Sequence, residues 1–291
     1  MQEEKTISRG SKIETQHFLY NRDARSMKDL DDQSIHLVVT SPPYWTLKKY
    51  NDHPGQLGHI EDYETFLAEL NLVWQECFRV LVPGGRAVIN VGDVCLSRKQ
   101  NGRHLVMPLH ADIMVACRKI GFDNLNPILW LKISNAQFEA NANSKFLGKP
   151  YEPNAIVKND VEFLLMQRKP GGYRKPTMEQ RSASKLPKKE FNEWFRQVWT
   201  LTGARDSSHP APYPLALAER LVRMFSFVGD TVLDPFLGTG TTAIAAGRWR
   251  RHSVGYEVDP EYFRLAKKNI ENATDLYQEL TVCTEHNAGN Q

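Results

Sequence analysis

The chain has 291 residues, of which 41% are hydrophobic, and its formal net charge is +3 at pH 7. A chain of this size and composition can bury a full core, which excludes an intrinsically disordered protein. The first fourteen residues are polar and mixed in charge, without the apolar run of a signal peptide or membrane anchor. We therefore expect a globular, cytoplasmic protein with no membrane association.

The cysteines and histidines show no metal-binding pattern. Cys77, Cys95, Cys117 and Cys283 are scattered without CxxC spacing, and the first three lie within apolar stretches. The histidines also lack the spacing of metal ligands. We therefore expect neither a disulfide nor a metal site.

Short runs rich in β-branched and aromatic residues alternate with amphipathic helical patterns. The runs that predict strands lie at residues 17–20, 35–40, 86–91, 126–133, 161–166, 231–236 and 252–258. The patterns that predict helices lie at residues 62–81, 108–120, 214–227, 241–250 and 260–273. Strands separated by helices imply parallel crossovers and therefore a doubly wound α/β sheet. In such sheets, function lies at the carboxyl ends of the strands.

Residues 135–206 break this alternation, because they are rich in Asn, Lys, Arg, Pro and Gly. We interpret them as an insertion that presents basic loops. Within it, residues 168–189 carry eight basic side chains and one acid, Glu179, which gives a net charge of +7. Taken alone, such a run is typical of a solvated charged loop.

The sequence VLDPFLGTGTT (residues 232–242) joins a predicted strand to a predicted helix through Gly238 and Gly240. Glycines let a backbone approach a ligand, and the amides that open the helix attract an anion. Glu257 ends the following strand, where an acid can accept both hydroxyls of a ribose. The loop therefore predicts a site for a nucleoside cofactor.

The glycine pattern leaves the identity of that cofactor open. Gly238, Gly240 and Ala243 also satisfy the relaxed dinucleotide pattern of NAD-binding proteins, and tight packing of strand on helix is a further alternative. Asp234 lies directly before the loop, where a carboxylate would repel a pyrophosphate but suits a cationic amino group. This favours S-adenosylmethionine, whose carboxylate the helix N-terminus can bind.

The stretch TSPPYW (residues 40–45) ends a predicted strand in two prolines. The Pro42 carbonyl and the Ser41 hydroxyl can accept hydrogen bonds from a planar amine, with Tyr44 as a flat wall. Two such bonds would localise the lone pair of a nucleobase amino group and point it at a methyl donor. A purely structural turn with aromatic packing is the alternative.

Three motifs together closely resemble the amino-directed DNA methyltransferases of the permuted β class. They are TSPPYW, HPAPYP (residues 209–214) and LDPFLGTGTT (residues 233–242). The resemblance covers residues 15–272. It implies a class I S-adenosylmethionine-dependent methyltransferase (Rossmann-like) sheet, circularly permuted, with a basic target-recognition insertion. The implied parts are a catalytic half (1–134), the insertion (135–206), a cofactor-binding half (207–275) and a polar tail (276–291).

The resemblance also assigns site residues. The catalytic turn comprises Ser41, Pro42, Pro43 and Tyr44. The cofactor-binding residues are Asp23, which matches the acid that hydrogen-bonds the adenine, together with Asp234, Phe236, Gly238, Gly240, Thr241 and the ribose acid Glu257. Beside such a turn, the basic insertion is interpreted as a DNA-facing surface, formed by Lys145, Lys149, Arg168, Lys169, Arg174, Lys175, Arg181, Lys185, Lys188 and Lys189.

The first letter of the turn bears on the substrate. Within the family, SPPY accompanies mostly the N4 amine of cytosine, so Ser41 favours cytosine, while N6 of adenine stays open. Methylation at cytosine C5 is disfavoured, because it needs a thiolate, usually from a Pro-Cys step that this chain lacks. The target base of a duplex must be flipped out and held by stacking, here on Tyr44.

The resemblance implies double-stranded DNA as the partner, in the cytoplasm of a prokaryotic cell. It leaves open a cognate restriction endonuclease, and both a monomer and a homodimer. A non-catalytic DNA-binding protein would explain the basic insertion but neither loop. An NAD-dependent oxidoreductase would explain the glycine loop only.

Overall fold

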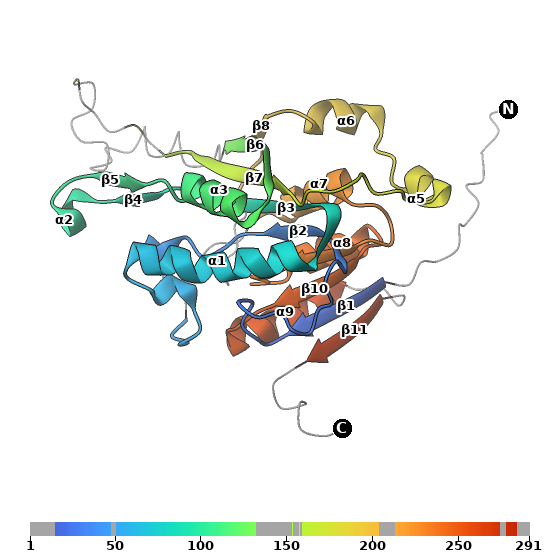
Figure 1. The fold of residues 1–291 in the computed structure, drawn as a ribbon, viewed down its shortest axis with the longest axis horizontal. Coiled ribbons are helices and arrows are strands. Elements are labelled where there is room, and N and C mark those ends of the chain that lie inside the picture. The colour runs from blue at the N-terminus through green and yellow to red at the C-terminus, as the bar shows by residue number, and fades with distance from the viewer. Residues whose placement is uncertain are drawn as a thin grey trace.

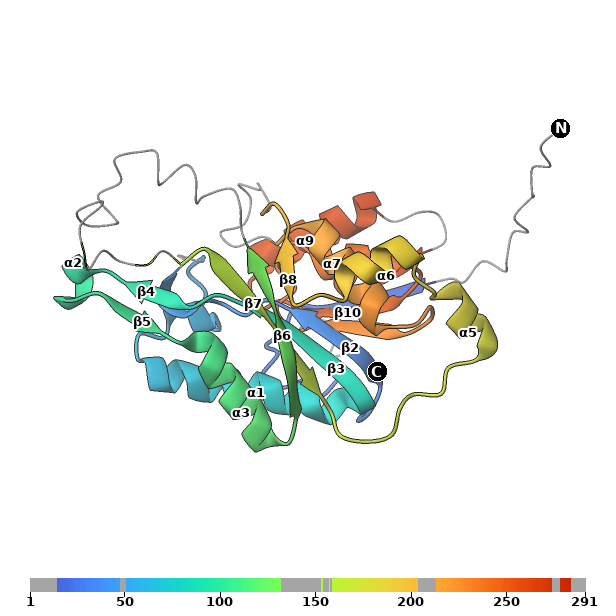
Figure 2. The ribbon, with the colours of Figure 1, turned by 90° about the horizontal axis from the view of Figure 1, so that it is seen from above.

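A computed structural model describes residues 15–47, 51–131, 153, 157, 159–203, 213–273 and 278–283. Its centre is a nine-stranded sheet with the order β11-β1-β10-β9-β2-β3-β7-β6-β8 (Figures 1 and 2). In chain order these strands are β1 (Thr15–Tyr20), β2 (Ile35–Thr40), β3 (Leu81–Val91), β6 (Asp123–Leu131), β7 (Val161–Arg168), β8 (Val198–Thr200), β9 (Thr231–Asp234), β10 (His252–Tyr256) and β11 (Gln278–Cys283).

Two helical layers cover the sheet. Helices α1 (Tyr63–Val80) and α3 (Leu109–Ile120) lie on one face (Figure 1). Helices α7 (Leu215–Phe225), α8 (Thr241–Arg248) and α9 (Pro260–Ala273) contribute to the cores of the other face. This arrangement confirms the doubly wound α/β architecture that the sequence predicts.

Helix α1 illustrates how the sequence determines a layer. Asp62 caps its start by accepting a hydrogen bond from the Thr65 amide. Its buried residues recur three or four positions apart, the spacing of a helix that packs one face on a sheet; they are Tyr63, Phe66, Leu70, Val73, Trp74, Cys77 and Val80.

The order of the strands in the sheet differs from their order in the chain, and this difference brings the two unusual loops together. β9 and β10 come late in the chain but lie between β1 and β2, and Val38 of β2 pairs with Leu233 of β9. Parallel neighbours end at the same edge of the sheet. The proline turn after β2 and the glycine loop after β9 therefore meet, although almost 200 residues separate them in sequence.

One strand departs from the predicted parallel crossovers. β7 is antiparallel to β3 and to β6, whereas the other neighbouring pairs of this sheet are parallel. β7 also lies inside the predicted insertion 135–206, so the predicted domain boundaries cut through the main sheet. β7 belongs to the core because it pairs with β3 on one side and β6 on the other, and because its apolar side chains Leu164 and Met166 are buried.

The remaining elements are short. They are the 3₁₀ helices η1 (Trp45–Leu47) and η2 (Leu57–His59), the hairpin strands β4 (Val94–Leu96) and β5 (Leu105–Met107), and the helices α2 (Arg98–Asn101), α5 (Met178–Ala183) and α6 (Lys188–Trp194). Among the described residues, no helix has both the length and the apolar character that crossing a membrane requires.

Candidate active site

The proline turn follows directly on β2. Ser41 is half-buried, and its hydroxyl donates a hydrogen bond to the Tyr44 hydroxyl at 3.3 Å. Trp45 has a φ of +44°, which is strained for a bulky residue. Its indole N–H donates to the Ile60 carbonyl at 2.8 Å, and its ring contacts Tyr63 edge-on. Trp45 therefore anchors the turn to the body of the protein.

A buried polar network supports the turn from behind. The Asn90 amide donates to the Tyr44 hydroxyl at 3.1 Å and to the Glu162 carboxylate at 3.0 Å. Asn90 lies near the end of β3 and Glu162 near the start of β7, so three neighbouring elements fix the Tyr44 ring. The sequence analysis missed both residues. The available signal was a carboxylate in the otherwise apolar run of β7.

Asp234 is buried beneath the glycine loop, and both its oxygens are occupied. One oxygen accepts the Thr40 hydroxyl at 2.6 Å and the Phe236 amide at 3.1 Å. The other accepts the Thr242 hydroxyl at 2.7 Å and the Tyr213 hydroxyl at 3.4 Å. Burial raises the pKa of Asp234 to about 6.

These contacts give Asp234 a structural role. A carboxylate has about four acceptor positions, and four protein donors fill them here. Asp234 also does not line the neighbouring pocket. Its carboxylate ties the end of β2 to the glycine loop and to the start of α8. A direct contact with the cofactor stays a prediction.

Glu257 connects the glycine loop to the end of β10. One carboxylate oxygen accepts the Gly238 amide at 2.9 Å, and the other accepts the Asp259 amide at 3.0 Å. Burial raises the pKa of Glu257 to about 7. Two backbone amides thus orient the carboxylate, while each oxygen keeps an acceptor position for a ligand hydroxyl.

Gly240 serves packing more than ligand approach. Its φ is +86°, a left-handed conformation that favours glycine, and it forms the N-cap of α8. An added Cβ would lie 3.0 Å from the Ile270 side chain of α9. Tight packing, one of the alternatives for the loop, therefore accounts for this glycine.

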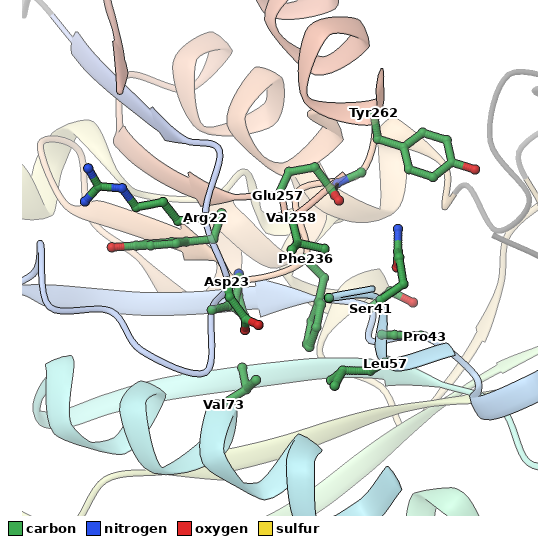
Figure 3. Close-up of a pocket in the computed structure, with 16 residues that line it drawn as sticks. Arg22, Asp23, Ser41, Pro43, Leu57, Val73, Phe236, Glu257, Val258 and Tyr262 are labelled. Atoms are coloured by element: carbon green, nitrogen blue, oxygen red, sulfur yellow. Dashed lines mark hydrogen bonds between the residues drawn. The ribbon is translucent and has the colours of Figure 1, made fainter. Parts of the chain in front are cut away.

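A single pocket brings the two motifs together (Figure 3). Of the predicted site residues, those that line it are Asp23, Ser41, Pro43, Phe236, Gly238 and Glu257. Those that do not line it are Pro42, Tyr44, Asp234, Gly240 and Thr241. The lining residues that the sequence analysis missed are Arg22, Ala24, Gly55, Gln56, Leu57, Val73, Pro235, Tyr256, Val258 and Tyr262.

The signals for the missed residues differ in kind. Tyr256 and Val258 flank Glu257, so adjacency in sequence pointed to them. Gly55 packs so closely on the Val258 side chain that an added Cβ would lie at 2.5 Å from it, and a Pro-Gly step marks its loop. Val73 belongs to the buried stripe of α1, where nothing distinguishes a pocket wall from core.

The lining fits an adenosyl cofactor. Phe236, Leu57 and Val73 give apolar walls, as an adenine ring requires, and Figure 3 shows the Phe236 ring pointing into the space between Asp23 and Ser41. Asp23 contributes a carboxylate to the lining, and both its oxygens accept hydrogen bonds from Arg25, one of them from the Arg25 Nε at 2.9 Å. Glu257 contributes a second carboxylate to the lining.

The basic stretch 168–189 lies far from this pocket. β7 runs antiparallel to β3, and Arg168 pairs with Arg86, which in turn pairs with Leu37 near the amino end of β2, toward the edge opposite Ser41. Gln180 then donates to the Val228 carbonyl, in the loop that precedes β9. The segment is thus held at the amino edge of the sheet, away from Ser41. Its interpretation as a DNA-facing surface stays a prediction.

Several of the predicted DNA-binding cations also have partners within the protein. Arg168 pairs with Asp123 at 2.8 Å, Arg174 pairs with buried Asp230, and the Lys169 ammonium donates to the Leu81 carbonyl at 2.8 Å. The exposed ones are Lys175, Arg181, Lys185, Lys188 and Lys189. Lys145, Lys149 and residues 209–212 of HPAPYP lie outside the described residues.

Comparisons with known proteins identify the family. The model of the DNA methylase family of N6 and N4 amino-methyltransferases matches residues 35–268. The type II methyltransferase M.MjaI of Methanocaldococcus jannaschii is 42% identical over 289 residues, which cover 89% of this chain and 92% of the relative. M.MthZI of Methanothermobacter thermautotrophicus is 35% identical, covering 93% and 81%.

Solved structures agree. TTHA0409 from Thermus thermophilus, a candidate DNA modification methylase in complex with S-adenosyl-L-methionine, is 55% identical, with a TM-score of 0.77 over 91% of this chain and 98% of that chain. PvuII DNA methyltransferase (cytosine-N4-specific) has a TM-score of 0.63 at 20% identity, covering 93% and 98%, a likeness of fold alone. The predicted class I methyltransferase fold is confirmed. The chain belongs to the N4/N6 amino-methylating DNA methylase family, whose cofactor is S-adenosylmethionine.

Proposed function

We propose that this chain methylates the exocyclic N4 amine of a flipped-out cytosine in duplex DNA. The observation that carries the proposal is the shared pocket, in which Ser41 of the proline turn lies with Phe236, Gly238 and Glu257 of the cofactor side. A target amine bonded to Ser41 would therefore lie in the same cavity as the methyl donor.

The cofactor residues have separate tasks in this proposal. When bound, S-adenosylmethionine supplies an electrophilic methyl group on its sulfonium. Glu257 accepts the ribose hydroxyls, Asp23 binds the adenine edge, and Phe236 packs on the adenine ring. Asp234 holds the loop in the conformation that these contacts need, through Thr40 and Thr242.

The proline turn acts on the amine. A nucleobase amino group is a poor nucleophile, because its lone pair is delocalised into the ring. Hydrogen bonds from its two protons to the Ser41 hydroxyl and the Pro42 carbonyl would localise that lone pair toward the methyl group. After transfer, the methylated cation loses one of these protons to water or to Ser41, which restores the neutral amine.

Tyr44 positions the turn and offers a ring for stacking. Its side chain is only 6% exposed and is bonded to Ser41 and Asn90. A flipped base therefore stacks on the Tyr44 ring only after that ring is uncovered. Flipping the base costs a few kcal/mol, and the stacking of the base on Tyr44 and its hydrogen bonds to the turn offset this cost.

The direct test is to identify the methylated nucleoside. Duplex DNA of mixed sequence is incubated with the protein and S-adenosylmethionine carrying a labelled methyl group, then digested to nucleosides for mass spectrometry. We expect labelled N4-methylcytosine. Labelled N6-methyladenine would retain the mechanism but contradict the base assignment, and absence of label from DNA would contradict the proposed function.

A further inference from the structure

The β4–β5 hairpin leaves the sheet at the same edge as the proline turn. β3 ends at Val91, and β4 begins at Val94, which is buried in the main core. β4 also contacts η1, the helical turn that follows Tyr44. The base of the hairpin is therefore fixed beside the proline turn.

Beyond this base the hairpin projects from the body of the protein, with α2 at its end (Figures 1 and 2). Only its inner residues pack on the core, namely Val94, Leu96 and Met107. At the tip, Gly102 has a φ of +71°, and an added Cβ would meet no atom within 4 Å. The tip thus lies in open solvent.

The tip is uniformly basic. Residues 97–104 read SRKQNGRH and contain no acid, so Arg98, Lys99 and Arg103 give a net charge of +3. These three side chains and His104 are exposed. Across the described ranges, none of the three cations forms an ion pair.

Position distinguishes the hairpin from the basic stretch 168–189. There, Arg168 and Arg174 pair with Asp123 and Asp230, and the segment with its exposed lysines lies at the opposite edge of the sheet. In the hairpin the three cations have no ion-pair partner among the described residues, and they lie on the side of the molecule that holds the pocket. A cationic side chain that forms no ion pair within the protein can bind a phosphate without first breaking such a pair.

We propose that the β4–β5 hairpin is an arm that binds the phosphate backbone of duplex DNA beside the target base. The inference rests on the proposed function, because a base flipped into the pocket stays attached to its strand. The flanking phosphates must then pass the edge of the sheet that holds Ser41. Arg98, Lys99 and Arg103 contact these phosphates, which positions the duplex without reading its sequence.

The test compares two charge-matched triple variants. The arm variant carries Arg98→Ala, Lys99→Ala and Arg103→Ala, and the control carries Lys185→Ala, Lys188→Ala and Lys189→Ala at the opposite edge. Affinity for a fluorescent DNA duplex is measured by anisotropy over a series of salt concentrations. Because all six side chains are exposed, both variants should keep the wild-type melting temperature and affinity for S-adenosylmethionine.

For the arm variant we expect affinity to fall at least about tenfold at low salt. We also expect the log-log salt slope to shrink by about 2.7, since each lost phosphate contact removes about 0.9. The control variant should change the slope by less than about 1. Equal effects of the two triples, or an unchanged slope in the arm variant, would overturn the proposal, as would a larger effect of the arm variant on an RNA duplex than on DNA.

Methyl transfer by the same proteins separates this proposal from the proposed function. If the wild type methylates DNA and the arm variant binds DNA like the wild type, the proposed DNA contact of the hairpin is refuted and the proposed methyltransferase function is retained. If the arm variant loses DNA affinity as expected while the wild type transfers no methyl group, the proposed DNA contact of the hairpin is supported and the proposed methyltransferase function is refuted.

Discussion

At the scale of single residues, Glu257 has two tasks, and both need its carboxylate to be charged. Its carboxylate is oriented by the Gly238 and Asp259 amides, and in the proposed complex it accepts the ribose hydroxyls. Both tasks require the charged form, whereas desolvation favours the neutral form and raises the pKa to about 7. Cofactor binding is therefore linked to the loss of a proton.

This linkage predicts a pH-dependent affinity for the cofactor. Above pH 7 Glu257 is charged, and the protein binds S-adenosylmethionine with its highest affinity. Below pH 7 Glu257 is protonated, and binding of the cofactor requires that the carboxyl group first lose its proton. We expect the affinity to fall about tenfold for each pH unit below that point. Calorimetric titration from pH 8 to pH 5.5 measures it.

Glu257→Gln is the matched control, because it has nearly the same shape but does not titrate. Its affinity at pH 8 should be lower than that of the wild type by about tenfold, since the amide places an N–H against the Gly238 N–H. Its affinity should also lack the decline below pH 7. An identical decline in the variant would assign the pH dependence to another group.

At the scale of elements, Asp234 joins the two halves of the site. The Thr40 hydroxyl at the end of β2 donates to it at 2.6 Å, and the Phe236 amide of the glycine loop donates to the same oxygen. The proline turn and the cofactor loop therefore share a charged, buried hydrogen bond. Their relative position depends on this bond as well as on the pairing of β2 with β9.

Removing the link should lower stability. Thr40→Val keeps the β-branched shape but leaves one acceptor position of a buried carboxylate empty. We expect the free energy of unfolding to fall by about 2 kcal/mol. Urea denaturation at pH 8, where Asp234 is charged, measures the change.

Thr231→Val is the control on β9 itself, because the Thr231 side chain has no hydrogen-bond partner among the described residues. That variant should change stability by less than about 0.5 kcal/mol. Equal losses in the two variants would show that the Thr40 hydroxyl contributes nothing specific.

At the scale of the whole molecule, the sequence predicted the site better than the surfaces around it. TSPPYW and the glycine loop are local patterns, and each dictates its own turn geometry. Asp23, Ser41 and Glu257 accordingly line one pocket, although they are far apart in sequence. The strand-helix alternation likewise predicted the doubly wound sheet.

The features that could not be predicted from the sequence are those that tertiary pairing decides. The direction of β7 is set by its neighbours β3 and β6, and that direction moved residues 168–189 to the edge opposite the pocket. The occupied oxygens of Asp234 depend on Thr40, which lies 194 residues away in sequence. Neither composition nor periodicity carries this information.

The central claim is that Ser41 acts on the target amine while the glycine side of the same pocket holds the cofactor. Ser41→Ala tests it through two readouts: the single-turnover rate of methyl transfer to a duplex that the wild type methylates, and the affinity for S-adenosylmethionine. We predict a rate loss of about a hundredfold or more, as for other fixed hydrogen-bonding groups that stabilise a transition state. The cofactor affinity should change by less than about threefold, which is about 0.7 kcal/mol, because the hydroxyl is assigned to the target amine. A parallel loss of cofactor affinity, or an unchanged rate, would contradict the account.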